Sequence, residues 1–113
     1  MASRRRRSVM LAGVAGALLT VMGSAASASA ATTYPIAPGL RLNVRSGPGT
    51  SYPIVRVLPE GSNVAVLCQT PGTTVSGYYG TSNIWDCIGS DEFISDTYVK
   101  TGSDGYIRPR CGS

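Results

Sequence analysis

The sequence contains no histidine. Histidine is the usual general base at neutral pH and the commonest metal ligand, so its absence removes the simplest catalytic and metal-binding arrangements. A cysteine hydrolase needs a thiolate paired with such a base, which argues against Cys87 as a nucleophile. The three cysteines also lack the CxxC spacing of a structural zinc site. We therefore predict no catalytic residue, no metal site and no cofactor.

Charged residues are scarce, at 14% of the chain, and only six of them are acidic. A glycosidase needs two opposed carboxylates at a controlled separation. We expect instead that these acidic residues are solvated charges, because exposed Asp and Glu are the norm. They are Glu60, Asp86, Asp91, Glu92, Asp96 and Asp104. The pair at 91–92 lacks the alternating oxygen ligands of a calcium loop.

A basic cluster and a long apolar run occur together only near the start of the chain. Four arginines at 4–7 precede an apolar stretch of about 14 residues and then a run of alanine and serine, the order of a secretory signal peptide. Such a stretch is too short to anchor the chain across a bilayer core of roughly 30 Å. We predict cleavage after Ala30, with Ala28 as the alternative, by the Sec or the twin-arginine route. The protein is therefore expected outside the cell or at the cell wall.

The net charge of +4 belongs to this first segment. Beyond residue 30, the remaining basic residues balance the six acidic ones. Nucleic-acid binding usually needs a clustered basic face, and none is visible, so nucleic acid is not an expected partner. The remaining chain of roughly 80 residues is one domain of marginal stability, which a disulfide would support. One pair among Cys68, Cys87 and Cys111 can close, and the count alone does not say which.

Short apolar stretches separated by Gly, Pro and Ser clusters predict strands from residue 40 onward. Residues 31–39, with two prolines, are expected to form a flexible lead. No helical period is present, and about five short strands in about 75 residues predict a small all-β barrel. The expected strands are 40–44, 54–58, 63–68 as the hairpin partner of 54–58, 73–79, 83–88, a strand or turn at 93–100, and 106–107.

The segment 42–53, Leu-Asn-Val-Arg-Ser-Gly-Pro-Gly-Thr-Ser-Tyr-Pro, resembles the opening motif of bacterial SH3-like (SH3b) domains. Apolar positions from 55 to 66 continue the pattern, and 93–99 resembles the segment before the final strand of those domains. The likeness covers 40–107, and the layout at 79–86 and 101–106 further resembles short secreted actinobacterial versions. The resemblance implies an SH3-like barrel over residues 40–113.

In those short secreted versions, the resemblance implies a disulfide between Cys68 and Cys111. Cys87 departs from the family pattern, in which a lysine is usual after Trp-Asp. A Cys68–Cys87 bridge across neighbouring strands stays open, although cross-strand geometry is often unsuited to bridging. An unpaired Cys87 would carry a small thiol, link two chains into a dimer, or stay protected in a monomer.

A binding module needs exposed aromatic side chains and a few polar groups on a rigid frame. In SH3-like barrels the groove lies between the first long loop and the following hairpin loops, and this groups the candidate ligand-binding residues. They are Arg45, Tyr52, Tyr78, Tyr79, Trp85 and Tyr98. The alternative is that Trp85 and Phe93 belong to the core and that Tyr98 is a packed corner residue.

The resemblance also implies attachment to the cell envelope, often to peptidoglycan cross-bridge peptides. Eukaryotic SH3 binding of proline-rich helices does not carry over, because this chain lacks the Ala-Leu-Tyr-Asp-Tyr strand and the paired tryptophans. We expect a non-catalytic module for the peptide or glycan part of peptidoglycan. The alternatives are a domain that docks on or inhibits another secreted protein through the same groove, and an envelope component dimerised through Cys87.

Overall fold

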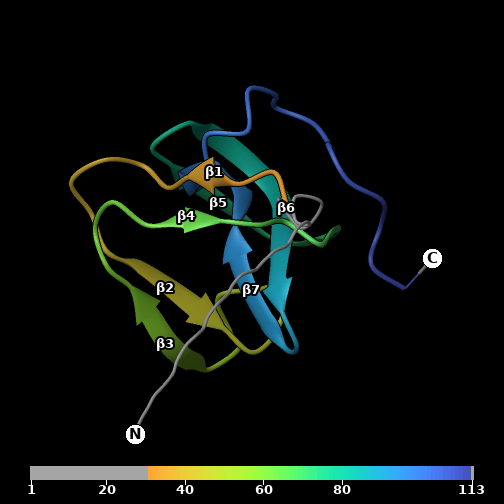
Figure 1. The fold of residues 1–113 in the computed structure, drawn as a ribbon. Coiled ribbons are helices and arrows are strands. Elements are labelled where there is room, and N and C mark those ends of the chain that lie inside the picture. Colours follow the sequence, from red (N-terminus) through yellow and green to blue (C-terminus); the bar gives the residue numbers. More distant parts are fainter. Residues whose placement is uncertain (1–30, 113) are drawn as a thin grey trace, which may run out of the picture. The chain divides into compact units, whose positions relative to one another are not determined.

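The computed structural model describes residues 31–112, and the predicted signal peptide at 1–30 lies outside this range. The regular structure of the described residues consists of β-strands and one 3-10 turn, without an α-helix (Figure 1). Within it, no helix is long and apolar enough to cross a membrane. The elements are β1 (Tyr34–Pro35), β2 (Leu42–Arg45), β3 (Ile54–Leu58), β4 (Asn63–Val64), β5 (Cys68–Gly77), β6 (Gly80–Gly89), β7 (Glu92–Ser95) and η4 (Asp96–Tyr98).

The strands form two antiparallel sheets. A five-stranded sheet has the order β3-β2-β7-β6-β5. In a second, two-stranded sheet β1 pairs with β4, and these two strands lie side by side in Figure 1. The core packs against one face of β2, where Leu42 and Val44 are buried and Asn43 is exposed. Its buried members are Ile36, Leu42, Val44, Leu58, Val64, Val66, Ile94 and Val99. The expected small, all-β, SH3-like fold with a disulfide is confirmed.

The hairpin partner expected for 54–58 is wrong. β3 pairs with β2, with Leu58 opposite Leu42, whereas β4 is only two residues long and pairs with β1. The turn at 59–62 is tight, because both the backbone N–H and the hydroxyl of Ser62 donate to the carbonyl of Pro59, at 3.3 and 2.6 Å. The chain leaving this turn pairs with the N-terminal strand instead of returning along β3.

Part of the N-terminal segment 31–39, which was expected to be flexible, belongs to the folded domain. Besides forming β1, it buries Ile36 and Ala37, and the N–H of Ala37 donates to the carbonyl of Tyr98 at 2.8 Å. At the other end, the strand expected at 106–107 is not formed. Its backbone instead binds a side chain, that of Gln69, through the N–H groups of residues 107 and 108.

The β5–β6 hairpin is the longest element, with ten residues in each strand. Its ladder is regular at both ends but shifts register between Pro71 and Val75. Cys68 and Cys87 lie directly opposite each other near one end of it. The irregular segment contacts the first long loop, and the cysteine pair lies beside the C-terminal tail.

Candidate functional site

The first long loop, residues 46–53, is closed by hydrogen bonds from its own strand. The N–H of Ser46 donates to the carbonyl of Pro53 at 3.0 Å. Arg45, at the end of β2, donates from Nη1 to the carbonyls of Thr50 and Tyr52, at 3.1 and 2.9 Å. Arg45 therefore holds this loop in one shape while its charge stays at the surface.

The same loop packs against the irregular part of β5. The N–H of Thr73 donates to the carbonyl of Pro48 at 3.3 Å, and the N–H of Thr50 donates to the Thr73 hydroxyl at 3.2 Å. Next to Thr73, a Cβ on Gly72 would lie 1.8 Å from the Pro48 carbonyl oxygen, far inside van der Waals contact. Only glycine allows so close an approach of loop and strand.

Trp85 on β6 packs against this contact between the first loop and β5. Its Nε1 donates to the carbonyl of Thr73 at 2.8 Å, and its side chain is only 2% exposed. Its Cδ1 would lie 2.9 Å from a Cβ on Gly72. The alternative that Trp85 is a buried packing residue is thus correct, and its ring also forms a wall of the adjoining cavity.

We call this space the Trp85 cavity, of about 360 Å³. It lies between β2, the first loop, β5, β6 and the end of β7. Its lining is mainly apolar or neutral, and among the described residues around it two are arginines and none is acidic. The lining residues are Leu40, Arg41, Leu42, Asn43, Arg45, Thr50, Val75, Trp85, Ser95 and Tyr98.

The predicted binding residues divide between separate places. Arg45, Trp85 and Tyr98 come together at the Trp85 cavity. Tyr52 is 44% exposed and packs over Gly47 rather than lining the cavity. The remaining two, Tyr78 and Tyr79, are exposed at the β5–β6 turn, edge to face with ring centroids 4.8 Å apart.

Sequence reasoning missed several residues of the cavity, chiefly Arg41 and Asn43. Both alternate with the buried residues of the β2 segment, so the expected strand at 40–44 could have identified them as the outward face. Thr50 could not be found in this way, because its position depends on how the first loop folds onto Thr73.

Two acidic residues contradict the expectation of solvated charges. Asp86 on β6 is 0% exposed and Asp96 in η4 is 5% exposed. Gln69 donates from Nε2 to Asp86 Oδ1 at 2.7 Å and lies 3.5 Å from Asp96 Oδ1. Asp86 Oδ2 has no hydrogen-bond donor among the described residues. By contrast, Glu92 forms an ion pair with Arg56 at 2.9 Å.

Burial, together with the neighbouring carboxyl of Asp96, raises the pKa of Asp86 to about 8. Burial also raises the pKa of Asp96. A proton on Asp86 removes the charge from the more deeply buried carboxyl and lets it donate to Asp96. The pair is therefore a protonated structural element near neutral pH, with the buried Gln69 amide as its partner.

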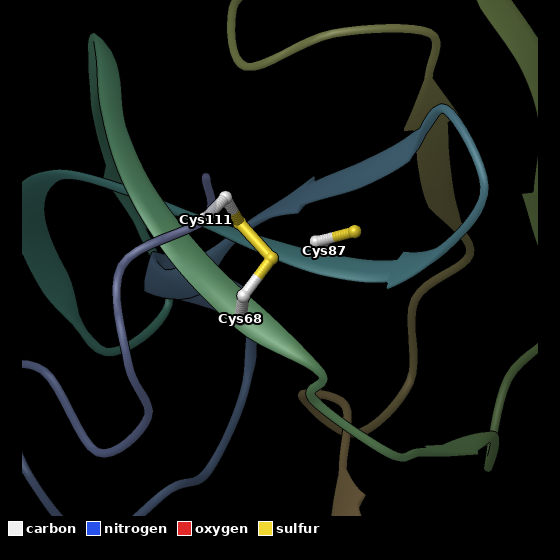
Figure 2. Close-up of side chains that lie close together, drawn as sticks. All are labelled: Cys68, Cys87 and Cys111. Atoms are coloured by element: carbon white, nitrogen blue, oxygen red, sulfur yellow. A yellow bond between two sulfur atoms is a disulfide. The ribbon is translucent and has the colours of Figure 1, made fainter. Parts of the chain in front are cut away.

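The cysteines form a third feature (Figure 2). Cys68 and Cys111 are joined, with an Sγ–Sγ distance of 2.03 Å, which confirms the expected disulfide. The competing Cys68–Cys87 bridge is not formed, and Cys87 is a half-buried free thiol that donates to the carbonyl of Gly89 at 3.2 Å. All three sulfur atoms lie within 4.8 Å of one another, a cluster that their spacing along the chain did not predict.

Comparison with known proteins supports the resemblance. Residues 40–110 match the family model described as Bacterial SH3 domain. The chain is 46% identical over 103 residues to the uncharacterized protein YraJ of Bacillus subtilis (strain 168), covering 84% of this chain and 87% of that protein. It is 44% identical over 99 residues to the uncharacterized protein YraI of the same organism, covering 80% and 83%. These relatives do not support the actinobacterial part of the resemblance.

Proposed function

Because the chain belongs to the bacterial SH3 domain family, a family of binding domains often associated with the cell wall, we propose that it is a non-catalytic module that binds peptidoglycan through the Trp85 cavity. The observation that carries this proposal is that two arginines and two aromatic rings line the same cavity. They are Arg41, Arg45, Trp85 and Tyr98.

The charge of the cavity favours a ligand with a carboxylate. Arg41 is exposed at its rim, and none of the described lining residues is acidic. Guanidinium groups bind carboxylates with two parallel hydrogen bonds, and the stem peptides of peptidoglycan carry free carboxylates. We assign Arg41 to this contact and Arg45 to holding the loop, since its Nη1 already donates to two loop carbonyls.

The aromatic groups favour a ligand with flat or ring-shaped apolar faces. Tyr98 is half-buried at the cavity and offers its ring and hydroxyl, while Trp85 supplies an apolar wall. Both sugar rings and peptide side chains pack on such surfaces. Tyr52, Tyr78 and Tyr79 are exposed beyond the cavity, and we assign them to the outer parts of a longer ligand. Secretion by the signal peptide would bring the module to this ligand.

Co-sedimentation of the oxidised protein with purified peptidoglycan tests the proposal. We expect saturable binding by the parent and about tenfold weaker binding by Arg41→Ala, the loss of one charge-assisted contact. Lys100→Ala is the matched control, because it removes one exposed positive charge away from the cavity. A parent protein that stays in the supernatant at micromolar concentration would contradict the proposal, as would equal losses in both variants.

One observation favours a second candidate, docking on another secreted protein. β3 is an edge strand of the five-stranded sheet, and Ile54 and Val55 on it are 48% and 49% exposed. Edge strands with exposed apolar side chains are suited to pairing with an added strand. Val55→Lys should abolish such docking and leave binding to peptidoglycan unchanged, so co-sedimentation of this variant separates the two functions.

A further inference from the structure

The three-sulfur cluster is built from distant parts of the chain. Cys68 lies on β5, Cys87 lies on β6, and Cys111 lies in the C-terminal tail (Figure 2). The register of the hairpin places Cys68 opposite Cys87. An isolated parallel bridge between Gln69 and Arg110 brings the tail, and with it Cys111, to the same place. The result is a free thiol within 4.8 Å of both sulfur atoms of a disulfide.

We propose that this cluster is an internal thiol–disulfide exchange site. The Cys87 thiolate attacks Sγ of Cys68, the Cys68–Cys111 bond breaks, and Cys111 leaves as a thiolate that takes up the proton Cys87 has lost. One sulfur–sulfur bond forms as another breaks, so there is no net oxidation, and no external oxidant or reductant is needed. The products are a Cys68–Cys87 disulfide and a free Cys111.

The hairpin register makes the new bond feasible. Residues directly opposite in an antiparallel pair have Cβ atoms about 4.5–5.5 Å apart, close to the roughly 3.5–4.5 Å that a disulfide requires. In the structure, the Cys87 sulfur points away from the disulfide and donates to the Gly89 carbonyl at 3.2 Å (Figure 2). Rotation of the Cys87 side chain, with loss of this one hydrogen bond, turns the sulfur toward Cys68.

Cys68 is a better target than Cys111 because its strand stays paired during the reaction. Attack on Cys68 links β5 to β6, which are already neighbours, and releases the cysteine of the tail. After release, two backbone hydrogen bonds still hold the tail beside β5. The N–H of Cys111 donates to the carbonyl of Gln69 at 2.9 Å, and the N–H of Gln69 donates to the carbonyl of Pro109 at 3.0 Å. The residues on either side of Cys111, Arg110 and Gly112, are exposed.

Exchange therefore moves the reactive thiol from the middle of the β6 ladder to the C-terminal tail, where both neighbouring residues are exposed. Cys87 in its present position is poorly placed to join a second chain, whereas a released Cys111 can form a mixed disulfide with another thiol-bearing molecule. We assign intermolecular linkage by this protein to Cys111, with Cys87 as the internal nucleophile. This assignment does not depend on what the Trp85 cavity binds.

Disulfide mapping after incubation tests the exchange. The folded, oxidised protein is held at about pH 8.5 or about pH 4.5, then denatured and alkylated with excess N-ethylmaleimide at the lower pH, where thiolate is scarce and exchange is slow. Mass spectrometry of non-reduced peptides then identifies the alkylated cysteine. We expect the Cys68–Cys87 peptide with alkylated Cys111 to form at least about tenfold faster at the higher pH. Alkylated Cys87 alone, at every time and pH, would overturn the proposal.

Two variants separate exchange from direct reaction at Cys87. With Ellman's reagent as a small disulfide probe, the parent should carry the mixed disulfide on Cys111, and Cys87→Ser, which keeps the Cys68–Cys111 bond, should not react. An adduct found on Cys87 of the parent would contradict the proposed route. In Cys111→Ser, air oxidation should join Cys68 to Cys87, and persistence of two free thiols in the folded variant would show that the cross-strand bond cannot form.

Discussion

The indole Nε1 of Trp85 donates a hydrogen bond of 2.8 Å to the backbone carbonyl of Thr73. The N–H of the same threonine donates to the carbonyl of Pro48 in the first long loop, at 3.3 Å. A buried ring on β6 and a surface loop after β2 are thus connected through one residue of β5. The shape of the Trp85 cavity depends on this connection, because the loop supplies Thr50 to its lining.

Gly72→Ala should disturb this connection directly. The added Cβ would meet the Pro48 carbonyl at 1.8 Å and the Trp85 ring at 2.9 Å, so the loop must move away from β5. We expect a loss of about 1–3 kcal/mol in the free energy of unfolding, the usual cost of overpacking. Gly105→Ala is the control, because its Cβ would meet nothing closer than 3.8 Å. Equal urea midpoints for both variants would contradict the tight contact.

The buried carboxyl pair predicts a fall in stability as the pH rises. The pKa of Asp86 is about 8 in the folded protein, above its ordinary value of 3.8, so between these values the folded state holds more protons than the unfolded state. The contribution of this group is therefore fully present below about pH 4 and is lost as the pH rises through about pH 8. The raised pKa of Asp96 acts in the same direction.

Asp86→Asn tests this dependence. The amide keeps an oxygen for Gln69 Nε2 and supplies an N–H for Asp96 without a titrating group, so urea unfolding from pH 4 to pH 8 should show a smaller decline than in the parent. Asp91→Asn, at an exposed turn, should retain the parental decline. A decline in Asp86→Asn as steep as in the parent would show that Asp86 is not the responsible group.

Gln69 connects the carboxyl pair to the C-terminal tail. Its Oε1 accepts from the N–H groups of Ile107 and Arg108, at 2.7 and 2.9 Å, while its Nε2 donates to Asp86. Gln69→Leu leaves these groups unpaired, and we expect a loss of about 2–4 kcal/mol. Hydrogen exchange should show lost protection at the amides of 107 and 108. Unchanged protection there would mean that the disulfide alone fixes the tail.

The Cys68–Cys111 disulfide joins residues separated by 43 positions. In the chain-entropy model, closing such a loop stabilises the folded state by roughly 3–4 kcal/mol. The Cys68→Ser, Cys111→Ser double variant should lose this amount in urea unfolding, and the same loss should follow when the parent is reduced. A loss below about 1 kcal/mol in both cases would contradict a stabilising role.

Local sequence patterns predicted those strands that can be recognised from their own composition and the turns beside them. The segment 54–58 is β3, because its composition and the turn after it are local features. β1 was not predictable, since two residues containing a proline form a strand only when Asn63–Val64 comes to pair with them. The family resemblance grouped Arg45, Trp85 and Tyr98 through the loop order of the barrel, and the structure brings these three residues together at one cavity.

Long-range contacts account for what the sequence could not show. Burial of Asp86 depends on Gln69 on the neighbouring strand, 17 positions earlier, and on Asp96 after β7, so the residue type alone indicated a solvated charge. The sulfur cluster likewise depends on the register of β5 with β6 and on the return of the tail beside Gln69. Neither arrangement has a signature in residue spacing.

The most direct test of the proposed peptidoglycan site is an NMR titration with soluble peptidoglycan fragments. The chain has one tryptophan, so its spectrum contains a single indole N–H resonance, from the group that hydrogen-bonds Thr73 at the cavity. We predict that this resonance and the amides of Arg41, Asn43 and Thr50 shift in a saturable way, and that the indole, Asn43 and Thr50 resonances of Arg41→Ala need about tenfold more fragment for the same shifts. Shifts confined to β3, or none at all, would contradict peptidoglycan binding at the Trp85 cavity.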